Sequence, residues 1–187
     1  MPEGNSNTLV RSLHDVGLAA WFGGSLMGAV GLNGATSDIG DARERGLLAA
    51  DGWARWAPVN AAAIGAYAIG GIGLIAANRD RVADQPDTRR NTAIKTLLSG
   101  AAIAVTAWSG ALGKKVSEGG LTPTAGATEP TPETESGVAA AQRQLKAAQW
   151  VIPALTGALI VLASAQGEQQ KPAQQRLARA KAAVGLD

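Results

Sequence analysis

The chain alternates long apolar segments with polar connectors. Four segments hold charged side chains only at their edges and are rich in alanine and glycine; they cover residues of about 14–35, 56–77, 95–113 and 147–166. Each has about 20 residues, the length that an α-helix needs to cross a hydrocarbon layer of about 30 Å. The pattern therefore predicts four membrane-spanning helices.

A soluble four-helix bundle is the main alternative to this interpretation. Its helices would carry a charged residue at about every third or fourth position on their outer face, and these segments carry none there. Strands are disfavoured because alanine is a poor strand former and no period-two alternation is present. We expect an all-α fold, an integral membrane four-helix bundle that forms a single domain over residues 1–187.

The first segment also differs from a cleaved signal peptide. Its apolar core exceeds the usual length of about 7–15 residues, and no A-x-A cleavage site follows. We therefore expect a retained span.

The connectors predict the orientation of the bundle. The short connector between the second and third spans is strongly basic, and it lies on the same side as both termini; its basic residues are Arg79, Arg81, Arg89, Arg90 and Lys95. Because short cytoplasmic loops carry an excess of Lys and Arg, both termini are predicted to be cytoplasmic. The predicted location is the plasma membrane, with multiple spans.

Three polar segments lie between or after the spans. Residues 114–137 are rich in Thr, Pro, Glu and Gly, which predicts an extended, mobile outer loop. Residues 36–55 are interpreted as a short surface helix that leads into the second span. From Val138 onward, good helix formers predict that the fourth helix begins outside the hydrocarbon. Residues 167–187 form a basic cytoplasmic tail, either a short amphipathic helix or a solvated end.

Composition excludes several classes of function. The chain has no cysteine, which rules out disulfides and thiolate ligands, and its net charge of +2 is too dispersed for a nucleic-acid interface. No serine lies beside a histidine base, and no histidine pair is available for a metal. We expect no enzyme activity, no cofactor, no metal and no nucleic-acid partner.

His14 and Asp15 at the start of the first span have two interpretations. The first is a proton relay or an axial haem ligand, because histidine titrates near neutrality and ligates iron. The second, which we favour, is an ordinary helix start at the interface, with His14 among lipid headgroups and Asp15 at the positive end of the helix dipole. Charges at the bilayer centre are more suspect than polar residues at its boundary.

Small residues recur at helical spacing in the first two spans. Such faces let helices approach closely, so they predict packing surfaces between these helices or toward another subunit. The predicted packing residues are Ala20, Gly24, Gly28 and Gly31 in the first span and Ala62, Ala66, Gly70 and Gly73 in the second. Among polar residues in the spans, Asn33 and Asn60 are expected to meet water near the outer surface.

The opening "HDVGLAAWFGGSLMGAVGLNGA" and the "WAPVN" start of the second span resemble small four-span membrane proteins of actinobacteria. Within that group, the span pattern is similar to that of an accessory subunit of the mycobacterial cytochrome bcc–aa3 respiratory supercomplex. The resemblance covers the whole chain but includes no diagnostic motif. It implies a plasma-membrane subunit without its own cofactor that contacts oxidase or reductase subunits through helix faces.

Three hypotheses for function follow. The first is a non-catalytic accessory or assembly subunit of a larger membrane complex, with other integral membrane subunits and lipid as partners. The second is a stand-alone transporter or channel, a homo-oligomer lined by hydroxyls such as Ser99, Thr106 and Ser109. The third is a haem- or quinone-associated electron carrier that uses His14. Transport is disfavoured because no span carries a charged residue at mid-depth.

Overall fold

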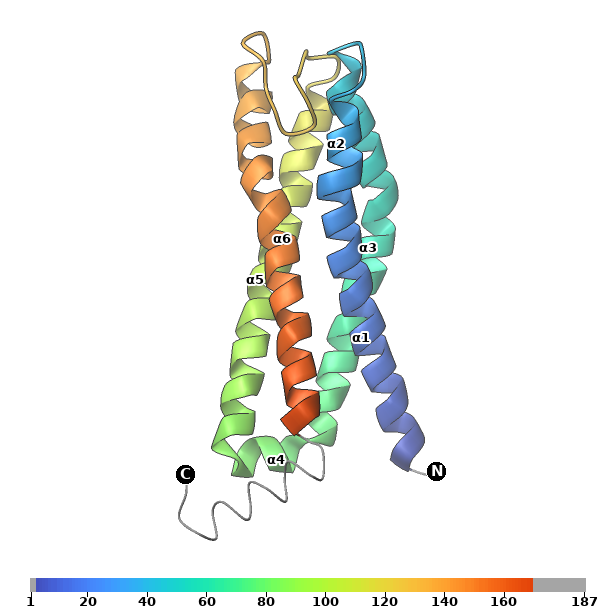
Figure 1. The fold of residues 1–187 in the computed structure, drawn as a ribbon, viewed down its shortest axis with the longest axis vertical. Helices are drawn as coiled ribbons and strands as arrows, with labels where there is room; N and C mark the ends of the chain where they lie inside the picture. Colours follow the sequence, from blue (N-terminus) through green and yellow to red (C-terminus); the bar gives the residue numbers. More distant parts are fainter. Residues whose placement is uncertain (1–2, 170–187) are drawn as a thin grey trace.

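The computed structural model describes residues 3–169, which form an all-α bundle (Figure 1). Within these residues no strand is formed. The elements are the α-helices α1 (Glu3–Met27), α2 (Asn33–Thr36), α3 (Glu44–Ala77), α4 (Arg79–Asp84), α5 (Pro86–Glu118) and α6 (Ser136–Gln169), with the π-helix η1 (Gly28–Leu32) between α1 and α2.

The long helices α1, α3, α5 and α6 form an antiparallel four-helix bundle. Helix α1 packs against α3 and α6, and α5 packs against the same two helices from the other side. The start of α1, helix α4 and the end of α6 share one end of the bundle, here called the terminal end; the opposite end is called the loop end (Figure 1). All four long helices have the length and hydropathy needed to cross a membrane. The predicted membrane four-helix bundle is therefore confirmed.

The helices extend beyond the apolar segments that predict them. Helix α3 begins at Glu44 and runs unbroken through the second span, so the helix expected over residues 36–55 starts at Glu44 and is continuous with the span. Ala42 and Arg43 form the turn that precedes α3, and the residues after it, rich in alanine and leucine, continue directly into the span. Helix α6 begins at Ser136, as expected for a fourth helix that starts outside the hydrocarbon.

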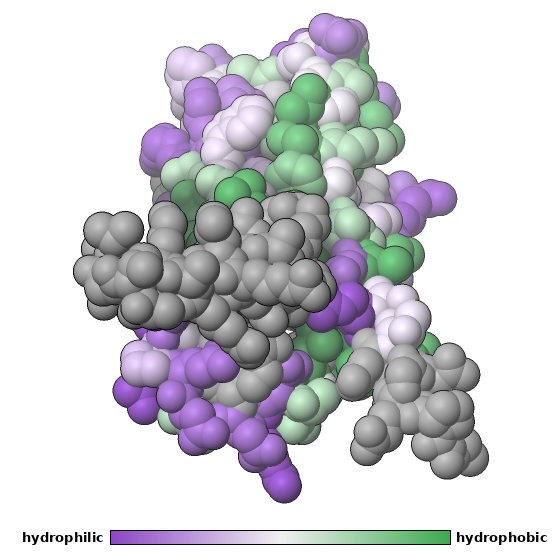
Figure 2. All heavy atoms as spheres, turned by 60° about the horizontal axis from the view of Figure 1, so that its bottom comes forward, coloured by the Kyte–Doolittle hydropathy of each residue, from purple (hydrophilic) through white to green (hydrophobic). Residues whose placement is uncertain are grey.

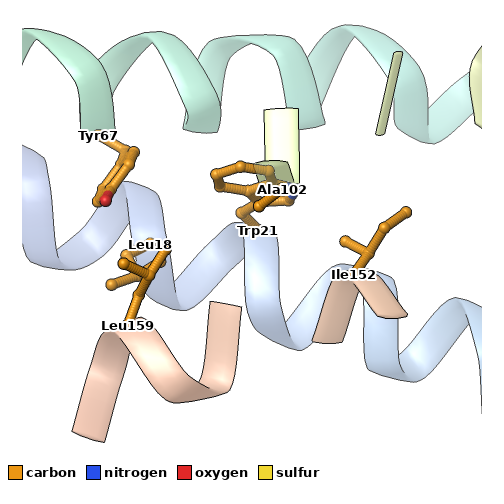
Figure 3. Close-up of a cluster of buried hydrophobic side chains, with 6 residues drawn as sticks. All are labelled: Leu18, Trp21, Tyr67, Ala102, Ile152 and Leu159. Carbon is orange, nitrogen blue, oxygen red and sulfur yellow. The ribbon is translucent and has the colours of Figure 1, made fainter. Parts of the chain in front are cut away.

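The main core lies in the middle of the bundle and combines all four long helices (Figure 3). Its largest buried side chain is Trp21, which has no exposed surface and packs beside Tyr67 of α3 and Ala102 of α5. Leu18 and Leu159 belong to the same cluster and join α1 to α6. Large side chains are few in this chain, so this cluster supplies much of the apolar packing that fixes the four helices.

The π-helix η1 adds one residue to a turn near the loop end of α1. The amide of Asn33 donates to the carbonyl of Gly28, a bond that spans five residues instead of the four of an α-helix. Asn33 is buried as a result, with 8 % of its surface exposed. The expectation that Asn33 meets water is therefore wrong.

The connector between α5 and α6 is folded against the loop end of the bundle. Residues 114–118 belong to α5 and residues 136–137 to α6, so the loop covers only residues 119–135. Thr124 and Thr134 are buried, and the amide of Thr124 donates to the carbonyl of Ala42 in the turn before α3. The side-chain amide of Gln142 donates to the carbonyls of Gly126 and Ala127.

This loop corrects the expectation of an extended segment over residues 114–137. Hydrogen bonds of its Thr residues, in place of large apolar side chains, hold the loop together. The Thr134 hydroxyl donates to the Pro123 carbonyl and accepts from the Thr131 amide. A composition typical of disorder therefore folds where polar partners are in place. The predicted basic tail lies outside the described residues from 170 onward.

Candidate functional site

The small residues of α1 and α3 pack these two helices together inside the chain. The face of Gly24 lies against the ring of Trp56, and the face of Gly28 lies against the ring of Trp53. A side chain at either glycine would overlap the indole. The GxxxG step therefore accommodates tryptophans of the same chain, and it is not free for another subunit.

Near the terminal end, the backbones of α1 and α3 touch. A Cβ atom added at Gly70 would lie 2.5 Å from the Val10 carbonyl oxygen, and one at Gly73 would lie 2.7 Å from the Val10 side chain. Gly17 is equally tight: a Cβ there would lie 2.5 Å from the Ala63 carbonyl oxygen. Gly17 is not among the packing residues predicted from the sequence, although it lies two helical turns before Gly24 on the same side of α1.

The remaining predicted packing residues contribute less to this contact. Ala20 and Ala66 are half-buried, whereas Gly31 and Ala62 are exposed. The neighbour of Gly31 is the side chain of Met27 on its own helix. Only part of each predicted face is therefore used between α1 and α3.

His14 is buried among these helices, with 5 % of its surface exposed. Its ring lies 4.7 Å from the ring of Tyr67, centroid to centroid, and its Nδ1 lies 2.8 Å from the Oδ1 atom of Asp15, where a protonated Nδ1 donates to the carboxylate. Helix α1 begins at Glu3, well before these residues. The expectation of His14 among headgroups and Asp15 at a helix start is therefore wrong.

A chain of polar contacts continues from His14 toward α5. The hydroxyl of Tyr67 is hydrogen-bonded to that of Ser99, and the Ser99 hydroxyl also bonds to the carbonyl of Lys95. Lys95 lies within electrostatic range of Asp15, which attracts it, and of Arg11, which repels it. Ionisable side chains of α1 and α5 thus come within electrostatic range of each other on the terminal half of the bundle.

A second polar link joins α1 to α5 across the core. The indole Nε1 of Trp21 donates to the Thr106 hydroxyl over 3.2 Å, and this hydroxyl donates to the Ala102 carbonyl. Because Ser99 and Thr106 are engaged inside the bundle, two of the three predicted channel-lining hydroxyls face the interior. Ser109 has a buried hydroxyl with no hydrogen-bond partner in the described part of the chain.

Asn33 organises the loop end. Its side-chain oxygen accepts from Trp53 Nε1 over 2.9 Å, and its side-chain nitrogen donates to Gln149 over 2.8 Å. Gln149 in turn lies 3.5 Å from the Thr128 hydroxyl of the loop. The side-chain amide of Asn33 thus joins α2 to α3 and α6, and Gln149 extends the network to the loop. The sequence gives no direct signal for this network, since its members are far apart along the chain.

Helix α5 is the most exposed of the four long helices. Only 6 % of its most apolar window is buried within the chain, against 17–33 % for the other three. Its exposed side carries small residues at helical spacing, and a Cβ added at Gly100, Gly110 or Gly113 would meet nothing within 4 Å. Further exposed residues of this side are Ala104, Ala107 and Ala111. We call Gly100, Ala104, Ala107 and Ala111 the α5 face.

The described residues contain no group of three or more His, Cys, Asp or Glu side chains that could hold a metal ion. What the structure provides is an internal glycine contact, a terminal-end polar cluster and one exposed small-residue face. Comparison of the chain with protein-family models, with curated proteins and with solved structures finds no match.

Proposed function

We propose that this chain is a non-catalytic accessory or assembly subunit of a larger membrane protein complex, and that the α5 face receives a helix of a partner subunit. The observation that carries the proposal is the uneven burial of the four spans. Helix α5 has only 6 % of its apolar window buried in the bundle. Small side chains on its open side allow close approach of a second backbone, which is how helices associate in lipid.

Other surfaces of the bundle are already occupied by contacts within the chain, which supports the same proposal. The loop end is closed by the folded loop, whose Thr124 and Ala125 carbonyls accept hydrogen bonds from Arg45 of α3. The tightest small residues of the first two spans, Gly17, Gly24, Gly28, Gly70 and Gly73, already lie against the neighbouring helix of the same chain. The α5 face, by contrast, remains exposed.

The finer identity of the complex is part of the proposal. The resemblance of "HDVGLAAWFGGSLMGAVGLNGA" and "WAPVN" to actinobacterial four-span proteins favours a respiratory complex of the plasma membrane. In that setting the chain brings no cofactor of its own and acts by holding neighbouring subunits together. Haem absorbance that co-purifies with the chain and survives His14→Ala would support this assignment. A Soret band from the isolated chain that disappears in His14→Ala would contradict it.

The homo-oligomeric transporter is less well supported. Its proposed lining hydroxyls, Ser99 and Thr106, are bonded to Tyr67 and Trp21 inside one bundle. They would have to leave these partners to line a pore between copies.

Purification in mild detergent followed by mass spectrometry tests the proposal. The tagged wild-type chain should retain foreign membrane subunits in fixed stoichiometry, and Ala104→Leu with Ala107→Leu should lose them because the added side chains block close approach. Ala62→Leu is the matched control, since Ala62 is an exposed small residue on α3. Recovery of self-associated chain alone, or equal loss in the control, would contradict the proposal.

A further inference from the structure

Two buried polar atoms at the loop end have no hydrogen-bond partner in the described part of the chain. They are the hydroxyl oxygen of Thr124 and the side-chain oxygen of Gln142. Thr124 is 1 % exposed and Gln142 is fully buried, so neither oxygen is in contact with the surrounding solvent. A buried polar atom without a partner is costly, and proteins commonly satisfy such atoms with an ordered internal water molecule.

The folded loop brings these two side chains into the same region. The side-chain nitrogen of Gln142 donates to the carbonyls of Gly126 and Ala127 over 3.0 and 3.1 Å. The amide group of Gln142 therefore lies directly under the turn that follows Thr124. Its nitrogen is engaged by the loop, whereas its oxygen, which can only accept a hydrogen bond, is not.

A space of about the size of a methyl group lies beside the Thr124 hydroxyl. Gly46 of α3 is buried there, and a Cβ atom added at Gly46 would lie 3.7 Å from both Oγ1 and Cγ2 of Thr124 and 3.9 Å from the Val116 side chain. These are ordinary van der Waals distances, so neighbouring atoms do not fill the space. A water molecule is similar in size to a methyl group, and a shift of about 1 Å brings it within hydrogen-bond distance of the hydroxyl.

The space lies where water reaches it without crossing lipid. Gly46 precedes Trp56, the first residue of the uncharged segment of α3, by ten residues, which is about 15 Å along the helix. The charged residues Arg43, Glu44 and Arg45 surround this start of α3. Figure 2 shows apolar residues along the flank between polar ends, and the space belongs to the loop end.

We propose that the space beside Gly46 is a binding site for one internal water molecule. The water accepts a hydrogen bond from the Thr124 hydroxyl and donates one to the Gln142 side-chain oxygen. A hydroxyl can donate directly to such an oxygen, so the lack of a direct bond means that the two atoms lie too far apart for one. A water molecule bridges this separation and ties the loop to α6.

Size and charge select water over other ligands. The space takes a single small molecule, which excludes an organic ligand. A metal ion requires several oxygen ligands, usually with carboxylates among them, and the Thr124 and Gln142 oxygens are both neutral. The guanidinium of Arg45 donates to the Thr124 carbonyl and places a positive charge beside the space, which further disfavours a cation.

Nuclear magnetic resonance of the full chain in lipid nanodiscs tests the proposal. With labelled threonine methyl groups, we expect a nuclear Overhauser cross-peak between water and the Thr124 methyl group. Thr36 is the matched control, because it is also 1 % exposed but its hydroxyl donates to the Asn33 carbonyl. A missing cross-peak at Thr124, or cross-peaks of equal strength at Thr124 and Thr36, would overturn the proposal.

Gly46→Ala fills the space and should displace the water. The added methyl group fits at van der Waals distance, so the variant should fold. We expect it to abolish the Thr124 cross-peak and to speed hydrogen exchange of the Gly126 amide about tenfold, through loss of a hydrogen-bonded bridge. Gly65→Ala is the control on the same helix, since a Cβ there would meet nothing within 4 Å, and it should change neither reading.

Alanine has the higher helix propensity, so without a displaced water Gly46→Ala would leave the exchange unchanged or slow it. That result, or a cross-peak that persists in Gly46→Ala, contradicts the site. Thr124→Val keeps the shape of the side chain but removes the hydroxyl, and it should speed exchange of the Gly126 amide by a similar factor. In this background Gly46→Ala should add nothing further, and additive effects of the two substitutions would overturn the proposal.

Discussion

Helices α1 and α5 have the same hydropathy but opposite surroundings. The most apolar window of each has a mean hydropathy of 1.3, yet 33 % of the α1 window is buried within the chain and only 6 % of the α5 window. Both helices are rich in glycine and alanine. In α1, Gly17 lies against the backbone of α3 and Gly24 against the ring of Trp56, whereas a Cβ at Gly100, Gly110 or Gly113 of α5 would meet nothing within 4 Å. Hydropathy thus predicts which segments can cross the membrane. Whether a helix face is packed within the chain is shown by the atoms that lie beside its small residues.

The largest expected difference between the two helices is in the free energy of unfolding lost when a tryptophan is replaced by alanine. Trp21 of α1 is fully buried, so Trp21→Ala should lower the free energy of unfolding by about 3–5 kcal/mol. Trp108 of α5 is 48 % exposed, and Trp108→Ala should cost far less. Unfolding in mixed detergent and sodium dodecyl sulfate, followed by circular dichroism, measures both. Equal losses would mean that α5 is as well packed as α1.

Glycine substitutions should give opposite signs in the two helices. A methyl group at Gly17 would press on the Ala63 carbonyl, so Gly17→Ala should destabilise the bundle by about 1–3 kcal/mol. Gly100 has open space around it, and Gly100→Ala should stabilise α5 by about 0.5–1 kcal/mol through helix propensity. The same unfolding assay reads both. A stabilising Gly17→Ala would show that the α1 and α3 backbones are not in contact.

A smaller effect is expected at the hydrogen bond that joins α5 to α3. Tyr67→Phe removes the hydroxyl that bonds to Ser99 and should cost about 1 kcal/mol. Ser99→Ala should cost a similar amount, and the double variant should cost less than the sum because both remove one bond. Strict additivity in this cycle would indicate that the two hydroxyls do not interact. The cycle measures how firmly α5 is held without help from a partner.

The smallest effect concerns the starts of the two helices that pack together. The Glu135 carboxylate accepts from the amides of Gly137 and Val138 at the start of α6, and these bonds lower the pKa of Glu135 below its usual 4.5. A carboxyl group with a lowered folded-state pKa stabilises the fold above its unfolded-state pKa, and this contribution is lost as the pH falls through the lowered value.

Acidification below a pH of about 4.5 should therefore loosen the start of α6, while the start of α5 has no side-chain cap to lose. Hydrogen exchange of the amides of Gly137 and Val138 measures the effect. Glu135→Gln should show fast exchange already at neutral pH and little further change on acidification. An equal response of both helix starts would contradict the role of Glu135.

The sequence predicts the spans because lipid imposes a simple rule: charged residues stay out of long helical segments. It also indicates which residues are small enough for close packing, such as Gly24 and Gly70. It does not indicate what fills the space beside them. Trp53 and Trp56 were available from the same chain, and only the antiparallel alignment of α1 and α3 brings them to Gly28 and Gly24.

The misplaced residues share one cause. His14, Asn33 and the loop over residues 119–135 are polar, and polarity alone predicts contact with water or headgroups for each of them. In the structure their partners come from distant positions: Tyr67 for His14, Gln149 for Asn33 and Gln142 for the loop. Local composition cannot report such pairs, since they depend on how the helices align.

Because η1 contains one extra residue, the first span can lose one residue at this position without a change in the direction of its other side chains. Each residue of an α-helix turns the chain by about 100°, so loss of one residue elsewhere in α1 would rotate the Trp21 side away from its neighbours. Loss of one residue between Gly28 and Leu32 would instead return that turn to α-helical geometry. The glycine contacts before it and the Asn33 amide after it would keep their directions, and the span would merely shorten.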